Sequence, residues 1–234
     1  MFEVKTGKIS EPFTALLYGI SGIGKTTLAS LAPKPILLDL ENGSGKIDVA
    51  RINLTRYDEL FSAMAWAATQ DYATVIIDST TVIQKLLTEN VLLVHKWKTL
   101  QQPGFGKGDA AVVEAWQRVL NAIRYIKASG KNCILVGHAR TKTFQDPMLE
   151  AYDRYEPDVS KNAISPLTAA LDCVFFYRYT TRVRQSDDEK RYLALGGNDR
   201  ELYTQEQPAF IAKNRYNLEP IIENPSSTLY ERLV

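Results

Sequence analysis

The chain has 234 residues and a formal net charge of +1, with 45% hydrophobic and 24% charged residues. This length suits one α/β domain with a substantial core and leaves no room for a second independent domain. The composition is that of a soluble globular protein, which excludes a disordered chain. Because the charges nearly balance, any binding of nucleic acid has to come from local surfaces.

The cysteines and the apolar runs exclude several further classes of protein. Cys133 and Cys173 lie in strand-like apolar runs, which favours buried thiols over a disulfide framework or a metal cluster. The apolar runs are too short to cross a membrane, and the first residues lack the apolar core of a signal peptide. We therefore expect a cytoplasmic protein with no membrane partner.

The chain begins with a polar stretch that ends at Pro12. Proline after a polar stretch is typical of a boundary. We predict an N-terminal arm at residues 1–12 and a single domain at residues 13–234.

Residues 16–31 join an apolar strand, a glycine-rich turn and a helix. The turn has the pattern G-x-x-x-x-G-K-T, in which Gly22 and Gly24 let backbone N–H groups face a phosphate that the following helix also attracts. Lys25 is placed to reach the β- and γ-phosphates, and the Thr26 hydroxyl is placed to hold Mg²⁺. The pattern predicts ATP and Mg²⁺ as ligands. The predicted cofactor-binding residues are Gly19, Ser21, Gly22, Ile23, Gly24, Lys25, Thr26 and Thr27.

Two buried strands, at residues 36–41 and 74–79, end in acidic residues. Ligand sites in parallel sheets gather at such carboxyl ends. Asp78 is predicted to orient the Mg²⁺ shell beside Thr26, the alternative being a cap for the next helix. For Glu41 the alternative to a catalytic role is a solvated acid at a strand end.

Helices are predicted by apolar spacing after a capping pattern at residues 55–58, over residues 82–97, and over residues 112–126. The stretch at residues 101–108 contains Pro103 and three glycines and is predicted to be a mobile loop that presents one aromatic side chain and one lysine. The alternative is a solvated linker.

A further buried strand, residues 132–138, ends in His138. A lone histidine is more often structural, but its place at a strand end beside the predicted site favours a functional role. Residues 143–166 are predicted to form a long irregular lid or binding loop. Residues 173–184 and 191–195 predict a β-hairpin, and a basic Lys-Asn-Arg run follows at residues 213–215.

The order of these features resembles the RecA-type recombinase core. More narrowly, four short runs resemble the phage-encoded, RecA-like single-strand annealing ATPases, and the resemblance extends from Phe13 to the C-terminus. These runs are residues 104–108, 136–138, 152–155 and 213–216.

The resemblance implies an α/β fold, a RecA-like P-loop NTPase core with a mainly parallel sheet flanked by helices and a C-terminal β-hairpin region. Together with Lys25, four residues would be catalytic. Glu41 would be the base for the attacking water, and His138 stands where RecA has a glutamine that senses the γ-phosphate. Lys213 and Arg215 would enter the ATP site of a neighbouring subunit in a homo-oligomeric ring or filament. The alternative for these two cations is a strand edge kept charged against aggregation.

The resemblance also implies single-stranded DNA as a partner, with a single-strand binding protein as a further partner, in the cytoplasm of a bacterial host if the protein is phage-encoded. Two segments correspond to the DNA-binding loops of the family. Their candidate DNA-binding residues are Phe105, Lys107, Arg140, Lys142, Arg154 and Lys161.

Three functions are therefore in view. The first is an ATPase, stimulated by DNA, that binds single-stranded DNA and promotes strand annealing or exchange. The second is a P-loop kinase for a small metabolite or nucleotide, although a kinase lid would be rich in arginine and residues 143–166 contain only Arg154. The third is a nucleotide-gated assembly factor without hydrolysis.

Overall fold

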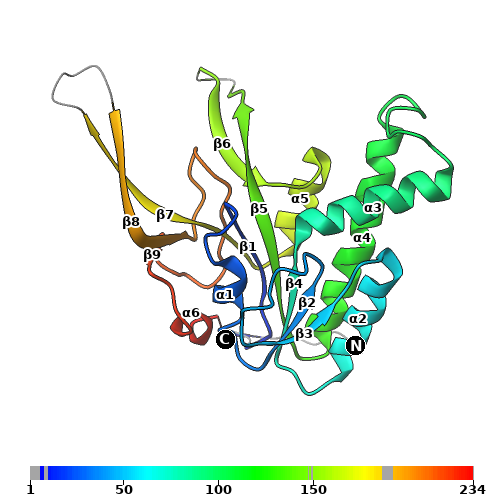
Figure 1. The fold of residues 1–234 in the computed structure, drawn as a ribbon, viewed down its shortest axis with the longest axis horizontal. Coiled ribbons are helices and arrows are strands. Elements are labelled where there is room, and N and C mark those ends of the chain that lie inside the picture. Colours follow the sequence, from blue (N-terminus) through cyan, green and yellow to red (C-terminus); the bar gives the residue numbers. More distant parts are fainter. Residues whose placement is uncertain (1–5, 8–9, 147, 149, 186–191, 234) are drawn as a thin grey trace.

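A computed structural model describes the chain except for residues 1–5, 8–9, 147, 149, 186–191 and 234. Its nine-stranded sheet has the order β3-β2-β4-β5-β1-β7-β8-β9, with β6 paired to β5 (Figure 1). The strands are β1 (Thr14–Gly19), β2 (Pro35–Asp39), β3 (Ala50–Asn53), β4 (Thr74–Asp78), β5 (Asn132–Phe144), β6 (Tyr152–Pro157), β7 (Cys173–Gln185), β8 (Tyr192–Tyr203) and β9 (Ile221–Glu223). The helices are α1 (Lys25–Ala29), α2 (Tyr57–Thr69), α3 (Thr80–His95), α4 (Lys107–Ala128), α5 (Lys161–Ala170) and α6 (Thr228–Glu231).

The centre of the sheet is parallel. Strand β1 pairs in parallel with β5 and β7, β4 pairs in parallel with β2 and β5, and β2 pairs in parallel with β3. The pairs β7–β8, β8–β9 and β5–β6 are antiparallel. The predicted α/β fold, with a mainly parallel sheet flanked by helices and a β-hairpin toward the C-terminus, is confirmed.

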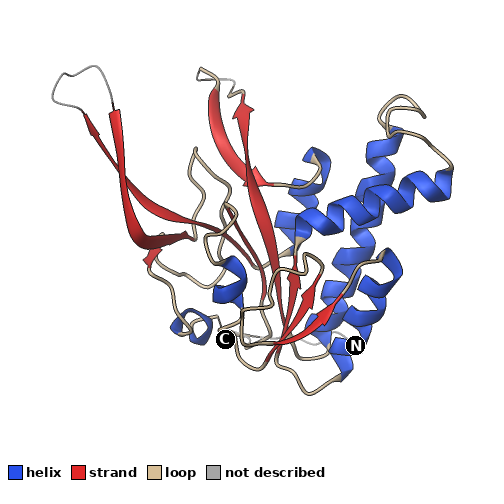
Figure 2. Cartoon of the chain, viewed as in Figure 1, coloured by secondary structure: helices blue, strands red, loops and turns tan. Residues whose placement is uncertain are grey.

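Helices cover both faces of the parallel strands (Figure 2). Leu16 and Leu135 belong to a core that contains buried side chains of α2, α3, α4 and α5. Leu17 and Val136, one residue further along the same strands, belong to a second core with α1 and α6. Because successive side chains point to opposite faces, a strand buried on both faces is apolar throughout, as these strands are in the sequence.

The buried carboxylate of Asp172 ties four elements together at the amino end of the sheet. It accepts hydrogen bonds from the backbone N–H and the hydroxyl of Thr14, both at 2.9 Å. Lys127 of α4 donates to it at 2.9 Å and Arg215 at 3.0 Å. Although burial opposes ionisation, the hydrogen bonds from Lys127 and Thr14 hold the pKa of Asp172 below its ordinary value. This carboxylate therefore connects the start of β7 with β1, with α4 and with the segment that contains Arg215.

The sequence suggested an irregular loop at residues 143–166, but the structure has a strand and a helix in this segment. Strand β5 continues to Phe144, β6 returns antiparallel to it, and α5 begins at Lys161. Pro166 lies inside α5. Its missing N–H removes one intrahelical hydrogen bond, and because proline usually ends a helical pattern, the sequence concealed this helix.

Three smaller predictions also differ from the structure. The stretch at residues 101–108 is partly helical, because α4 already begins at Lys107. The capping box of α2 lies one residue later than the predicted pattern at residues 55–58. Arg56 is the N-cap residue, and the carboxylate of Glu59 accepts its backbone N–H at 3.0 Å. Lys213 and Arg215 were expected to alternate on one face of a short strand, but the run at residues 213–216 is not a strand, and Lys213 forms only a single bridge, to Val174.

Strands β3 and β9 lacked a sequence signal, since they are short and largely exposed. The division at residue 12 stays a prediction, because much of the arm lies outside the described residues. In the part of the chain that the structure describes, no helix combines the length and the apolar character needed to cross a membrane.

Candidate functional site

The loop between β1 and α1 has the backbone shape of a phosphate cradle. Gly22 and Gly24 have φ angles of 78° and 96°, which lie in the left-handed region that other residues rarely adopt. A Cβ atom on Gly19 would lie 2.1 Å from the carbonyl oxygen of Tyr177. Glycine at this position therefore lets β7 pack directly against the start of the loop.

Lys25 is buried, with 6% of its surface exposed. Its Nζ donates to the loop's own carbonyl oxygens, Gly19 at 3.2 Å and Ile20 at 2.9 Å. Burial lowers the pKa of Lys25, and the nearby charges of Asp78 and Glu41 counteract only part of this effect. A desolvated ammonium group held against carbonyl oxygens of a phosphate cradle fits the role of a cation for the phosphates of ATP.

Asp78 lies next to the loop, where its Oδ2 accepts a hydrogen bond from Thr26 Oγ1 at 2.5 Å. Burial raises the pKa of Asp78 to about 6, against the lowering effect of the Thr26 hydroxyl, and the charge of Glu41 raises it further. Carboxylate and hydroxyl oxygens are ligands that Mg²⁺ prefers, usually together with substrate phosphates. Among the described residues, no three His, Cys, Asp or Glu side chains form a metal cluster. The site therefore fits Mg²⁺ bound together with a nucleotide.

Asp39 shapes the turn that carries Glu41. Its Oδ1 accepts the backbone N–H groups of Glu41 at 3.1 Å and Asn42 at 2.7 Å, and its Oδ2 accepts that of Ser44 at 3.1 Å. A carboxylate that accepts backbone donors two and three residues later fixes a tight turn. The sequence analysis gave Asp39 no role, although the pattern Asp-x-Glu-Asn-Gly-Ser after a strand signals such a turn.

Glu41 lies between two polar side chains from neighbouring strands. Its Oε1 accepts a hydrogen bond from the Ser79 hydroxyl and lies 2.9 Å from His138 Nε2. The side chains of Glu41 and His138 keep 30% and 28% of their surface exposed, so both remain accessible to a water molecule. Ser79 was missed in the sequence, where its only signal was its place directly after Asp78.

Lys213 and Arg215 lie at the opposite edge of the sheet, beside Asp172 and the start of β1. Lys213 Nζ donates to carbonyl oxygens at the end of α5, including Thr168 at 3.0 Å and Leu171 at 2.8 Å. Arg215 forms an ion pair with Asp172 at 3.0 Å. The sequence shows no acidic partner near these cations, and in the structure Arg215 finds one 43 residues away in sequence, at Asp172.

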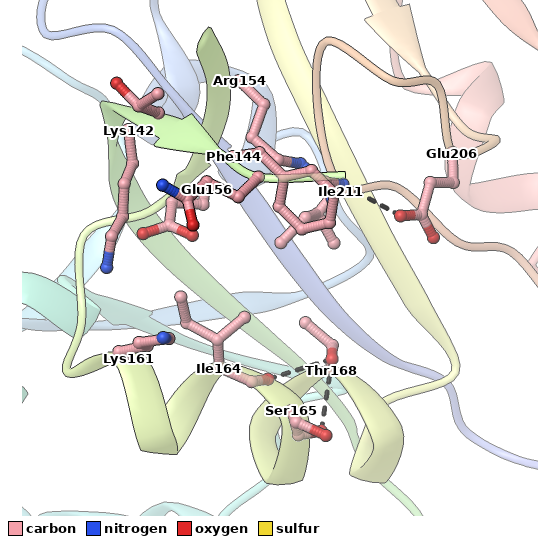
Figure 3. A pocket seen from close by; sticks show the side chains of 12 residues that line it. Lys142, Phe144, Arg154, Glu156, Lys161, Ile164, Ser165, Thr168, Glu206 and Ile211 are labelled. Carbon is pink, nitrogen blue, oxygen red and sulfur yellow. Dashed lines mark hydrogen bonds and ion pairs between the residues drawn. The ribbon is translucent and has the colours of Figure 1, made fainter. Parts of the chain in front are cut away.

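Three of the candidate DNA-binding residues line one cavity of about 700 Å³ between the β5–β6 hairpin and α5 (Figure 3). Lys142 comes from β5, Arg154 from β6 and Lys161 from the start of α5. Arg154 forms an ion pair with Glu206 at 2.9 Å and lies over the ring of Phe144, 5.1 Å from its centroid. The cavity thus combines cations with an aromatic ring.

The other candidate DNA-binding residues do not line this cavity. Arg140 lies on the same hairpin, two residues before Lys142, and is paired with Glu156 at 2.8 Å and with Asp158 at 3.7 Å. Phe105 is fully exposed in the turn between α3 and α4, and Lys107 begins α4. Figure 1 shows this turn at the tip of the helices, well apart from the β5–β6 hairpin. The structure therefore divides the predicted DNA-binding residues between two separate places.

One family model agrees with the geometry of the loop. A family model described as an AAA domain matches residues 11–216. No curated protein matches the sequence. One similar solved structure is that of a KaiC-like protein from the hyperthermophilic archaeon Pyrococcus horikoshii OT3, with 14% identity, a TM-score of 0.42, and coverage of 94% of this chain and 92% of that chain.

Replacing Glu41 and Lys25 should separate hydrolysis from binding. If Glu41 is the base, Glu41→Gln keeps ATP affinity near that of the unmodified protein and slows hydrolysis by on the order of 10²-fold or more. Lys25→Ala, which removes the cation for the β- and γ-phosphates, should lose ATP binding. Calorimetry and steady-state ATPase assays measure the two effects. An unchanged rate in Glu41→Gln would place the base elsewhere.

Replacing Asp78 should stabilise the ligand-free protein while removing its metal ligand. The folded-state pKa of Asp78 lies above its ordinary value, so the ionised carboxylate destabilises the fold at pH values above about 6, and this cost disappears as the pH falls. Asp78→Asn should therefore raise the free energy of unfolding at pH 8 by about 1–3 kcal/mol. It should also abolish the Mg²⁺-dependent part of the thermal stabilisation by ATP. A less stable variant with intact Mg²⁺ dependence would contradict both assignments.

Proposed function

The chain belongs to the AAA domain family of P-loop proteins, and from this premise we propose that it is an ATPase that binds single-stranded DNA and promotes strand annealing or exchange. The observation that supports DNA binding most directly is the register of β5 and β6. Lys142 lies directly opposite Arg154, with Arg140 opposite Glu156 on one side and Phe144 opposite Tyr152 on the other. All six side chains share one face of the hairpin, because side chains at every second position point the same way.

The opposed Lys142 and Arg154 favour an anion at this face. Like charges directly opposite each other in an antiparallel pair are destabilising, and a phosphate between them would relieve the repulsion. In the described part of the chain neither Lys142 nor Lys161 has an ion-pair partner, while Arg154 has only the exposed carboxylate of Glu206.

The neighbouring aromatic pair suits a base. The ring centroids of Phe144 and Tyr152 are 5.6 Å apart. Stacking of bases on aromatic side chains contributes about 1–3 kcal/mol per base to binding, without sequence preference. Cations beside an aromatic pair suit a single strand, whose phosphates and unpaired bases alternate along the chain. Binding should therefore weaken steeply with salt.

Strand β5 connects this face to the nucleotide site. His138 contacts Glu41, and Lys142 follows it four residues later on the same face, about 14 Å along the strand at about 3.4 Å per residue. A shift of β5 caused by the γ-phosphate would therefore move the basic face, and the reverse also holds because coupling between sites is reciprocal. This is the basis on which we propose stimulation of hydrolysis by DNA.

The chemistry of hydrolysis fits the residues at the loop. Lys25 would neutralise charge on the phosphates, Thr26 and Asp78 would hold Mg²⁺, and Glu41, fixed by Ser79 and His138, would orient and deprotonate a water molecule. Bound Mg²⁺ would supply further neutralisation of phosphate charge.

The position of the cavity supports the kinase alternative less well than it supports DNA binding. Phosphoryl transfer requires the acceptor to lie about 3–3.5 Å from the reacting phosphorus, whereas the cavity lies well along β5 from His138. A nucleotide-gated assembly factor without hydrolysis is the remaining candidate, and it would be favoured if Glu41 proved dispensable.

A homo-oligomer, with Arg215 acting on a neighbour's nucleotide, is also proposed. Its support is that 55% of the Arg215 side chain is exposed despite the ion pair with Asp172. Mixing inactive Lys25→Ala subunits with Arg215→Ala subunits should restore part of the ATPase activity, since an intact site then forms at one kind of interface. Sedimentation must show mixed oligomers in the same solution. No recovery in those oligomers would confine Arg215 to its own chain.

Removing the basic face should weaken DNA binding without affecting the nucleotide site. Lys142→Ala/Lys161→Ala should reduce the affinity for an oligothymidylate by at least about 10-fold at low salt, reduce the slope of affinity against salt, and abolish stimulation of the ATPase by DNA. Lys85→Ala/Arg124→Ala, which removes two exposed cations from α3 and α4, is the matched control. Fluorescence anisotropy at several salt concentrations measures the affinity. Equal affinities in the two double variants would refute this placement of the DNA.

A further inference from the structure

Arg200 of β8 reaches across the phosphate loop of its own chain. A Cβ atom built on Gly24 would lie 3.0 Å from Arg200 Nη1, 3.5 Å from Cζ and 3.8 Å from Nη2. Gly24 is the N-cap residue of α1, directly before Lys25 and Thr26. The guanidinium group therefore occupies the space that a side chain at Gly24 would need.

The fold fixes the position of Arg200. Strand β7 pairs with β1 up to Gly19, opposite Tyr177, and then continues past the end of β1. Tyr179 of this continuation pairs with Arg200, whose Cζ lies 5.8 Å from the centroid of the Tyr179 ring. The Arg200 backbone N–H donates to Asn224 Oδ1 at 2.9 Å, and its carbonyl accepts the Asn224 N–H at 2.7 Å. The arginine is thus anchored at its backbone and guided by an aromatic ring.

One donor of the guanidinium group is not satisfied by its own surroundings. Its Nε is buried and has no hydrogen-bond partner in the described part of the chain. A buried donor without a partner is destabilising, more so when the group is charged. The side chain of Tyr177, and after it that of Tyr179, raises the pKa of Arg200, so that it stays charged. An anion in the loop would be the counter-charge.

We propose that Arg200 is a phosphate-binding residue for the nucleotide of its own subunit, which closes over the phosphate loop from β8. The inference rests on the proposed ATP site and adds a cation from the β7–β8 hairpin to it. Arginine suits this position because its planar fork can donate two hydrogen bonds to phosphate oxygens. The absence of a side chain at Gly24 leaves room for this fork beside the N–H groups of the loop.

Binding of ATP and of inorganic tripolyphosphate, each with Mg²⁺, tests the proposal by calorimetry. Arg200→Gln should weaken both ligands by about 10- to 100-fold, the range for one lost charge-assisted hydrogen bond or two. Arg200→Lys keeps the charge and loses the planar fork, so its affinities should lie between those of the unmodified protein and those of Arg200→Gln. Arg178→Gln is the matched control, since Arg178 is adjacent to Tyr179 and its Nε donates to the Tyr179 carbonyl at 3.2 Å. It should leave both affinities unchanged.

Each other outcome overturns the proposal. Unchanged affinity for both ligands in Arg200→Gln would mean that the guanidinium does not reach the phosphates. Weakened ATP with unchanged tripolyphosphate would place the contact on the ribose or base. Full affinity in Arg200→Ala, together with a lower melting temperature of ligand-free Arg200→Gln, would indicate that Arg200→Gln weakens binding by destabilising the fold. If the unmodified protein bound neither ligand, the ATP site itself would fail, and the inference with it.

Discussion

Two charges of opposite sign are buried at the carboxyl edge of the sheet with too few partners, and the site depends on this arrangement. Among the described residues, Lys25 Nζ donates only to carbonyl oxygens of its own loop, and burial raises the pKa of Asp78 to about 6. Burying an ion costs several kcal/mol unless other groups compensate. The helices on both faces of the parallel strands cause the burial. The fold thus carries an electrostatic cost in the ligand-free state that a nucleotide with its metal ion would offset, so the same core that stabilises the sheet prepares the site.

The order of the strands decides which polar groups meet there. Because β5 lies between β1 and β4, His138 of β5 lies beside the loop that follows β1. It also contacts Glu41, which follows β2. The same strand then leaves the sheet and pairs with β6. One continuous element therefore contacts the candidate catalytic carboxylate at one point and carries a basic, aromatic face at another. A separate loop could not transmit a shift as directly, since backbone hydrogen bonds keep the residues of a strand in fixed relation to one another.

Local patterns revealed the phosphate loop, the apolar strands and Asp78, because each depends on residues adjacent in sequence. The pairing of Glu41 with His138 spans 97 residues. Their positions at strand ends indicated a site, but only the resemblance to a family suggested a base and a phosphate sensor. The opposition of Lys142 and Arg154 depends on the register of a hairpin, where a slip of one residue would turn the side chains to the other face. Arg200 had no signal at all, since its approach to Gly24 results from β7 extending past β1. Asp172 went unnoticed because it is 43 residues from Arg215 in sequence, so the sequence showed no acidic residue close to Arg215.

The cost of freeing each cation differs, and this difference ranks the proposed interactions. Arg154, whose side chain is 12% exposed, would leave Glu206, whose side chain is 61% exposed, so water can hydrate the released carboxylate. Arg215 would leave Asp172, which is only 9% exposed and would keep Lys127 and Thr14 as partners. Because removing a partner from a buried carboxylate is costly, an exchange of Arg215 to a neighbour's phosphate needs a larger compensating gain than the binding of DNA by Arg154. Assembly would then respond to bound nucleotide, which would supply that gain, while the basic face would bind a single strand with little rearrangement.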